Sequence, residues 1–476
     1  MVSTNPEKLT SDQIITIVVL AASAFIALVS ELVMGVALPT IMAELKISAS
    51  TGQWLTTGYA LTLAVIIPTT GYLLRRFRSR PIFAVSMGLF SLGTLIATLA
   101  PSFEVLLAAR VVQALGTGVL VPMLLTTTFG MVAPARRGQM MAMVTAVISV
   151  APAIAPAFSG LVMAQLSWRW LFIIILPFAL LGLILGALKI PNPSASSGSG
   201  FDVLSFVLAA VGFGALVYGL STVGEGAGAG IPVSFWVAVP LGLLGVGAFV
   251  VRQLRLQRNS TPLMNMRIFS RRAFTMSIVQ FGFLVAGAFS LSVLLPLVLQ
   301  ESFELGVFET GLFMAPGGVM IVVVSVFAGK VYDRMGARTL VVSGAVVIAA
   351  GWWFMSTVDQ AVPVWVVLVT FLVICAGQAL SWTPIYTLAL GSLPDELHAH
   401  GSAALNTVQQ LVGAAGLAVL VGIFTIHAKG SDPTSVIVGA QAAFAAGGVI
   451  AAAGIVAAIF LPSRARNAPL LEAVSR

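Results

Sequence analysis

The sequence predicts an all-α polytopic membrane protein, and three observations lead to this prediction. Of the 476 residues, 59% are hydrophobic and only 8% are charged, whereas a soluble domain carries roughly 25% charged residues. Apolar stretches long enough to cross a bilayer as helices follow one another along the chain. Arginines and lysines gather in alternate loops between these stretches. Such a chain cannot cover a large water-exposed surface, and little length remains for a soluble domain.

A membrane-spanning helix needs about 20 apolar residues, and applying this rule in order along the chain predicts fourteen spans. The first span follows a short polar head. Its apolar stretch of about 25 residues is too long for the core of a cleaved signal peptide, so we expect it to be retained. The predicted spans are 14–38, 53–74, 82–100, 104–130, 138–162, 168–190, 202–222, 233–251, 273–297, 308–330, 338–357, 363–388, 400–428 and 436–461.

The basic residues predict the orientation of the chain. With the N-terminus inside, cytoplasmic segments carry 20 of the 24 lysines and arginines, whereas external segments carry Lys46, Arg169 and Lys429. The remaining basic residue, Arg110, lies inside a span. This bias predicts a multi-pass protein of the inner or plasma membrane with both termini in the cytoplasm. It also accounts for the net charge of +8 without nucleic-acid binding.

Two similar loops indicate an internal duplication. The loop GYLLRRFRSR at 71–80 resembles GKVYDRMGAR at 329–338, and a glycine and two arginines align. Parallel six-helix halves are an architecture of transporters. The alignment therefore predicts a first six-helix half at 1–190, a linker with two inserted spans at 191–272, a second six-helix half at 273–461 and a tail at 462–476. The aligned residues are Gly71 with Gly329, Arg76 with Arg334, and Arg80 with Arg338.

Ionisable residues inside spans are the first candidates for function. Arg110 lies about two turns into its span, and Glu31 lies at a matching depth in the antiparallel first span. A buried charge is costly to keep in a membrane, and a carboxylate near an arginine can take up and release a proton as the geometry changes. The pair is therefore a candidate for proton coupling. The alternative is a permanent structural ion pair.

The fifth span and the two similar loops are candidates for moving parts. Pro152 and Pro156 each remove a helix hydrogen bond, and Gly160 allows close packing. The span is either a bent helix that seals or hinges a central pathway or an ordinary kinked helix. The basic loops could hold the cytoplasmic side closed by bonding the carbonyl ends of neighbouring helices, or could only set the orientation.

Amides and aromatic residues are candidates for the substrate pathway. Span thirteen places Asn406, Gln409 and Gln410 on one helical face, and Gln113 shares a face with Arg110. These amides could line a pathway or bond a neighbouring helix. Trp54, Tyr59 and Trp382 could form an adaptable apolar pocket or face the lipid. The sequence has no phosphate-binding GxxxxGK[ST] loop and no metal-binding cluster, so we expect neither an enzyme nor a bound metal or cofactor.

Several of these segments together resemble a known family. SELVMGVALPTI at 30–41, RVVQALGTG at 110–118, APAIAPAFSG at 151–160, GKVYDRMGAR at 329–338 and NTVQQLVGAAG at 406–416 are similar to the fourteen-span drug:proton antiporters of the major facilitator superfamily, lincomycin-resistance type. The resemblance covers nearly the whole chain. It implies a major-facilitator fold, an arginine linked to proton coupling at Arg110, and the proline motif that marks exporters.

The chain departs from the family pattern in three places, and one of them is in span one, where Glu31 stands one position after the place where many relatives have aspartate. Arg75 stands where the first gating loop usually has an acid, and only the second loop keeps its acid, Asp333. The first half is therefore expected to close through different contacts. The antiporter motif has alanine in place of glycine before Pro152 and Pro156.

The sequence thus predicts a monomeric transporter that exports amphipathic small molecules in exchange for protons, with the proton gradient as its energy source. The lipid bilayer, protons and a small-molecule substrate are its expected partners. Two other functions stay open, a dedicated transporter of a single metabolite and a non-transporting membrane sensor.

Overall fold

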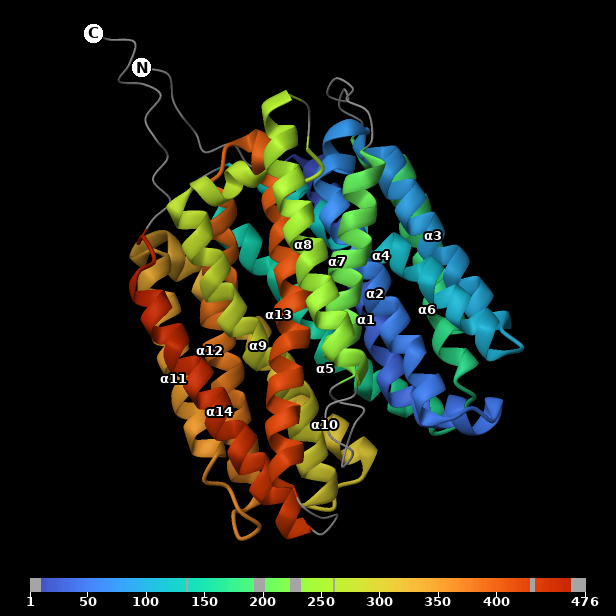
Figure 1. Ribbon diagram of the computed structural model, residues 1–476, viewed down its shortest axis with the longest axis vertical. Coiled ribbons are helices and arrows are strands. Elements are labelled where there is room, and N and C mark those ends of the chain that lie inside the picture. The colour runs from blue at the N-terminus through green and yellow to red at the C-terminus, as the bar shows by residue number, and fades with distance from the viewer. Residues whose placement is uncertain are drawn as a thin grey trace.

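The protein forms a bundle of long helices that run back and forth along one direction (Figure 1). The computed structural model describes residues 10–133, 136–191, 202–222, 233–259, 262–428 and 433–463. Within these residues the chain forms fourteen α-helices and two short 3-10 helices. A continuous helix bonds its own backbone polar groups, which a lipid environment requires.

The helices follow the order of the predicted spans and extend past most of them by several residues. The first seven are α1 (Ser11–Leu45), α2 (Ala49–Arg76), α3 (Ser79–Leu99), α4 (Phe103–Met131), α5 (Arg137–Met163), α6 (Arg169–Lys189) and α7 (Val203–Ser221). They are followed by α8 (Val233–Asn259), η2 (Met266–Ser270), α9 (Arg272–Glu301), α10 (Val307–Met335), α11 (Ala337–Met355), α12 (Val364–Gly391), η3 (Asp395–Leu397), α13 (His398–His427) and α14 (Pro433–Ile459).

Thirteen of these helices are long and apolar enough to cross a membrane, as judged from the described residues. The remaining long helix, α5, packs against α1 and α10 within the same bundle. The all-helical architecture is as predicted, whereas fourteen membrane crossings stay a prediction.

Two groups of six helices repeat the same packing. In the first half, α1 packs on α4, α5 and α6, while α3 packs on α4 and α6. In the second half, α9 packs on α12, α13 and α14, while α11 packs on α12 and α14. Each of these helix pairs thus recurs eight helices later along the chain. Figure 1 shows the first half mainly on the right and the second half on the left.

The inserted helices α7 and α8 pack on each other and lie in front of the line where the halves meet (Figure 1). Close backbone contact between them depends on small residues. A Cβ atom on Gly212 would lie 2.6 Å from the backbone nitrogen of Val246. Helix α7 contacts both α2 of the first half and α13 of the second. The inserted pair therefore covers a junction between the halves.

The ends of the bundle differ in charge. One end of the bundle holds most of the basic residues of the first half, and we call this end, in both halves, the basic end. In the first half its basic residues are Arg75, Arg76, Arg78, Arg80, Arg136, Arg137 and Lys189. At the opposite end, Glu44 joins the end of α1 to the start of α6. It forms an ion pair with Arg169 and accepts a hydrogen bond from Trp168. The helix directions thus place the basic loops on one side, as predicted.

Candidate functional site

The site is centred on Arg110, which lies in α4 and is fully buried. Its guanidinium donates to three backbone carbonyls, those of Leu55 (3.4 Å), Ser30 (3.1 Å) and Glu31 (3.3 Å). It also donates to Oε1 of Gln113 at 3.0 Å. These bonds use four of the five N–H donors of the side chain. Arg110 therefore joins α1, α2 and α4 at one depth.

The carboxylate of Glu31 is not in an ion pair with Arg110. Arg110 bonds the backbone carbonyl of Glu31, and the ion pairs found among the described residues, with a limit of 4.0 Å, do not include these two side chains. The Glu31 side chain is half-buried, and its carboxylate is close enough to Arg110 to interact with its charge. The predicted pair thus shares one site, with the carboxylate left outside the hydrogen-bond network.

Gln113 and Tyr59 complete the surroundings of the arginine. The buried Gln113 amide donates to Oγ1 of Thr94 at 2.9 Å and to Oγ of Ser30 at 3.4 Å. The ring of Tyr59 lies 4.0 Å from the guanidinium carbon, a cation–π arrangement. Its hydroxyl donates to Oγ1 of Thr117 at 2.8 Å. Nearly every polar group in this network has a hydrogen-bond partner, which favours a single arrangement of the side chains.

Sequence reasoning identified part of this network. Arg110 and Gln113 were expected on one face, and they bond each other. Ser30, Thr94 and Thr117 were not identified as site residues. A threonine or serine inside a span commonly bonds its own helix, and Thr94 also donates to the carbonyl of Phe90. Its second role, as an acceptor for Gln113, depends on how α3 packs on α4 and left no signal in the sequence.

The other predicted pathway residues are dispersed over both halves. Trp382 packs edge-on against Phe281 at 5.3 Å between ring centres. The hydroxyl of Tyr386, which was not predicted, donates to Oε1 of Gln409 at 3.3 Å. Gln410 is half-buried. Asn406 is buried and donates to the carbonyl of Ser402 in its own helix at 2.9 Å.

Trp54 lies apart from these residues. It is 41% exposed and stacks on Tyr218 of the inserted helix α7, with 5.7 Å between ring centres. It therefore contacts the inserted pair, whereas Tyr59, five residues later, is buried beneath Arg110.

The predicted moving parts are placed as follows. Helix α5 runs through both proline positions as one helix, and the side chains of Pro152 and Pro156 lie outside the described residues. The half-buried Gly160 accepts a hydrogen bond from Ala164. Gly329 packs against α5, where an added Cβ would lie 2.4 Å from that of Ala142.

The basic loops contact the ends of the sixth helix in each half. Nε of Arg80 donates to the carbonyl of Ile190, at the end of α6, at 2.9 Å. In the second half, the nitrogen of Ala337 donates to the carbonyl of Ser463, just after α14, at 2.8 Å. Arg76 lies 6.0 Å from the ring of Phe77. Arg334 and Arg338 are exposed, and the side chain of Asp333 lies outside the described residues.

The two halves are joined by side-chain hydrogen bonds near the basic end. Among the described residues these bonds are three: Arg75 with His400 (3.2 Å), Ser402 to the carbonyl of Pro122 (3.1 Å), and Thr145 with Thr383 (2.7 Å). All three lie in the half of the bundle nearer to the basic end.

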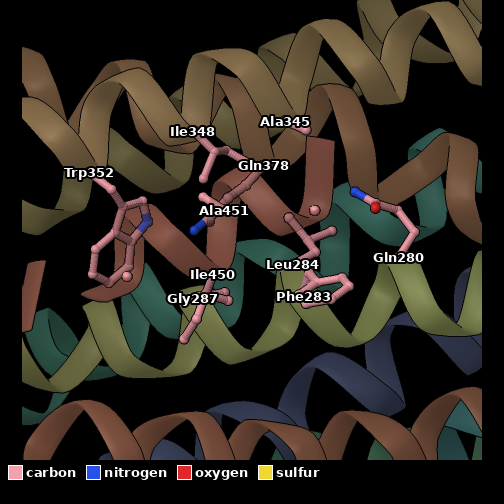
Figure 2. Close-up of a pocket in the computed structure, with 13 residues that line it drawn as sticks. Gln280, Phe283, Leu284, Gly287, Ala345, Ile348, Trp352, Gln378, Ile450 and Ala451 are labelled. Atoms are coloured by element: carbon pink, nitrogen blue, oxygen red, sulfur yellow. The ribbon is translucent and has the colours of Figure 1, made fainter. Parts of the chain in front are cut away.

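A separate small pocket lies inside the second half, between α9, α11, α12 and α14 (Figure 2). Trp352 and Gln280 stand at its two ends with Gln378 between them. Its volume of about 20 Å³ holds about one water molecule. The pocket is thus too small for an amphipathic drug.

Comparison with known proteins identifies the family. The Major Facilitator Superfamily model matches residues 20–203 and 199–417. The chain belongs to this superfamily. As expected for a transporter of this superfamily, it is not an enzyme.

Two relatives show which members of the superfamily the chain is similar to. The chain is 37% identical to the lincomycin resistance protein LmrB of Bacillus subtilis, over 93% of this chain and 94% of LmrB. It is 30% identical to the multidrug resistance protein B homolog of Mycobacterium tuberculosis, over 90% of this chain and 79% of that protein. The expected resemblance to lincomycin resistance proteins is confirmed.

Two solved structures share the fold at 15% sequence identity. The human organic anion transporter MFSD10 aligns with a TM-score of 0.64, over 94% of this chain and 99% of that chain. The proton:xylose symporter XylE aligns with a TM-score of 0.67, over 96% of this chain and 97% of that chain.

Proposed function

We propose that the protein is a proton-coupled exporter of amphipathic small molecules. It acts in the cell membrane as a monomer, with the basic end and both termini in the cytoplasm. The excess of arginine and lysine at the basic end supports this orientation. The names of the relatives, lincomycin and multidrug resistance proteins, support a drug-like substrate.

The arrangement of Glu31 and Arg110 carries the proposal. The guanidinium is held in place by backbone carbonyls and Gln113. It therefore acts as a fixed positive charge whose position does not depend on the carboxylate. The half-buried carboxylate of Glu31, outside that network, is left to bind either a proton or a cationic substrate. A carboxylate that can bind only one of these at a time supplies the competition that antiport requires.

The hydrogen bonds between the halves support a state that is closed at the basic end. With the basic end in the cytoplasm, the three hydrogen bonds between the halves all close the cytoplasmic side. Glu31 and Arg110 lie nearer to the opposite end of their helices. In this state Glu31 receives a proton from outside, and rocking of the halves then exposes the site to the cytoplasm.

The substrate pathway we propose lies between this site and the amides of α13. Gln409 with Tyr386 and the aromatic pair Trp382 and Phe281 offer hydrogen bonds beside apolar surface. Such mixed surfaces bind amphipathic molecules of varied shape. Gln410 and Tyr59 belong to the same proposed pathway, with Asn406 supporting α13 from within its own helix. We also propose that the prolines of α5 and the loops 71–80 and 329–338 guide the rocking motion.

Replacement of Glu31 by glutamine tests the function. Glu31→Gln keeps the size and polarity of the side chain but cannot change its charge. We expect loss of proton-driven efflux, measured as drug accumulation in cells with and without an uncoupler, at an unchanged protein level in the membrane. Asp12→Asn is the matched control, because Asp12 is an exposed acid at the start of the same helix. If Glu31→Gln exported drug at the rate of the unmodified protein, Glu31 would not be the proton-binding residue of an exporter.

A further inference from the structure

His400 occupies an unusual place, in the first turn of α13 where this helix crosses α2. The side chain is buried, with 1% exposure. A Cβ on Gly71 would lie 2.5 Å from its Nδ1 and 3.1 Å from its Cα, so the absence of a side chain at Gly71 lets the two helices meet here. One turn further along α2, Nη1 of Arg75 lies 3.2 Å from Nε2 of the histidine. We call this contact between α2 and α13 the Arg75–His400 seam.

The chemistry of arginine fixes the protonation state of the histidine in the closed seam. A guanidinium has only donors and stays charged. The contact therefore requires a lone pair on Nε2 and places the single ring proton on Nδ1. Nδ1 makes no hydrogen bond of good geometry, although the backbone of Leu263 lies beside the ring. His400 is thus neutral when the seam is closed.

A second proton on the ring would oppose the seam in two ways. It removes the lone pair that accepts from Arg75, and it places two positive charges about 3 Å apart in a buried position. Among the described residues Arg75 is the charged group that acts on His400. Asp395 faces the neighbouring His398, at 3.7 Å, and Arg137 lies over the ring of Phe129, which packs on His398. No carboxylate in the described part of the chain pairs with the His400–Arg75 contact.

We propose that His400 is a second proton-binding site, separate from Glu31, and that proton binding there parts the seam between α2 and α13. The neutral ring joins the halves at the basic end, and the protonated ring favours their separation. Because such coupling is reciprocal, separation of the halves also increases the affinity of His400 for protons. The assignment of this end to the cytoplasm rests on the proposed function, so protons from the cytoplasm would favour the inward-open state.

The test measures the distance between the halves as a function of pH. Spin labels are attached to cysteines at Val85 in α3 and Thr339 in α11, both exposed near the basic end. Cys375, the free cysteine, is replaced by alanine so that it takes up no label. Glu31→Gln is included so that proton binding by Glu31 does not contribute to the response. From about pH 8 to about pH 5 we expect the ratio of long to short distances to rise, by up to about tenfold per pH unit.

Variants at the seam give the controls. His400→Gln keeps a neutral acceptor, and we expect short distances at every pH. His400→Lys removes the acceptor and is charged at about pH 8 when exposed to water, so we expect long distances already at this pH. Arg75→Gln removes the like charge and reduces the response. His427→Gln, at the other end of α13, keeps the full response, and thermal unfolding of each purified variant verifies its fold.

Two results would overturn the proposal. One is an undiminished response to pH in His400→Gln, and the other is the absence of any response in the labelled protein that retains His400. Neither depends on transport, because the readout is a distance in a background that already lacks Glu31. Failure of the exporter assignment would instead appear in the drug accumulation of Glu31→Gln.

Discussion

An arginine inside a membrane bundle needs hydrogen-bond partners, and three of the four partners of Arg110 are backbone carbonyls. The carbonyls of Ser30, Glu31 and Leu55 belong to α1 and α2 and keep their positions whatever the state of the nearby carboxylate. A guanidinium held in this way supplies a constant field at Glu31. In the proposed mechanism, the residue that carries the proton, Glu31, is therefore distinct from the residue that sets its proton affinity, Arg110.

Gln113 is the side chain whose loss tests the network most directly. Gln113→Leu leaves a donor of Arg110 and the hydroxyls of Thr94 and Ser30 without their present partner. An unsatisfied buried group costs about 1–3 kcal/mol, so we expect a lower Tm of the purified protein. Gln165→Leu, at an exposed position, is the control and should leave Tm nearly unchanged. Equal Tm values for the two variants would contradict a structural role for this network.

Sequence could predict which residues in the site are polar and buried, but not how they pair. The spacing of Arg110 and Gln113 predicted a shared face, and antiparallel spans predicted a shared depth with Glu31. The bonds to backbone carbonyls depend on how closely α1 and α2 approach α4, which residue types do not encode. His400 was similarly out of reach, although Arg75 in the place of an acid indicated that the first loop closes by other contacts.

At the scale of single elements, composition predicted most helix limits to within about three residues, and the ends of α1 and α8 less closely. The span predicted at 104–130 is α4, Phe103–Met131, and the span predicted at 14–38 is α1, Ser11–Leu45. Helix α1 continues past the apolar stretch until Lys46, whose φ of 53° is left-handed and ends the helix. Hydropathy detects where lipid contact ends, whereas helices end where the backbone finds a cap.

The inserted helices depend on glycine at their contact. In Gly212→Val the added side chain would overlap the backbone of α8, because a Cβ there lies 2.6 Å from the nitrogen of Val246. We expect a clear loss of folded protein in membranes, measured by size-exclusion chromatography of a fluorescent fusion. Gly247→Val is the control, since an added Cβ there meets nothing within 4 Å. Similar yields of both variants would show that α7 and α8 tolerate separation.

The end of α1 carries a pH-dependent contact. Hydrogen bonding with Arg169 holds the pKa of Glu44 below its usual value of 4.5. The contact therefore stabilises the fold fully above about pH 4.5, and this contribution is lost as the pH falls through the lowered pKa of the folded state. The pair is substantially exposed, so the contribution is at most about 1 kcal/mol. Glu44→Gln should slightly lower Tm at about pH 7, and the difference from the unmodified protein should vanish in acid. A constant difference at every pH would contradict the ion pair.

At the scale of the whole molecule, transport requires the two halves to separate at each end in turn. In the present arrangement the side-chain hydrogen bonds between the described parts of the halves lie near the basic end. The duplicated packing of α1–α6 and α9–α14 allows each half to move as a unit. The two similar loops in the sequence indicated the duplication. Which end of the bundle is closed follows only from the contacts between the halves.

A cross-link between the halves should therefore stop transport. Thr145 in α5 and Thr383 in α12 lie with their hydroxyl oxygens 2.7 Å apart, close enough for a disulfide after replacement of both by cysteine. In a protein that also carries Cys375→Ala, we expect oxidation to abolish efflux and a reducing agent to restore it, because the cross-link keeps the basic end closed. The matched control is the single variant Thr145→Cys with Cys375→Ala, which cannot form this cross-link and should keep its efflux under the same oxidation. Efflux that continues in the oxidised Thr145–Thr383 variant would mean that α5 and α12 stay together throughout the cycle and that the halves do not rock apart at this point.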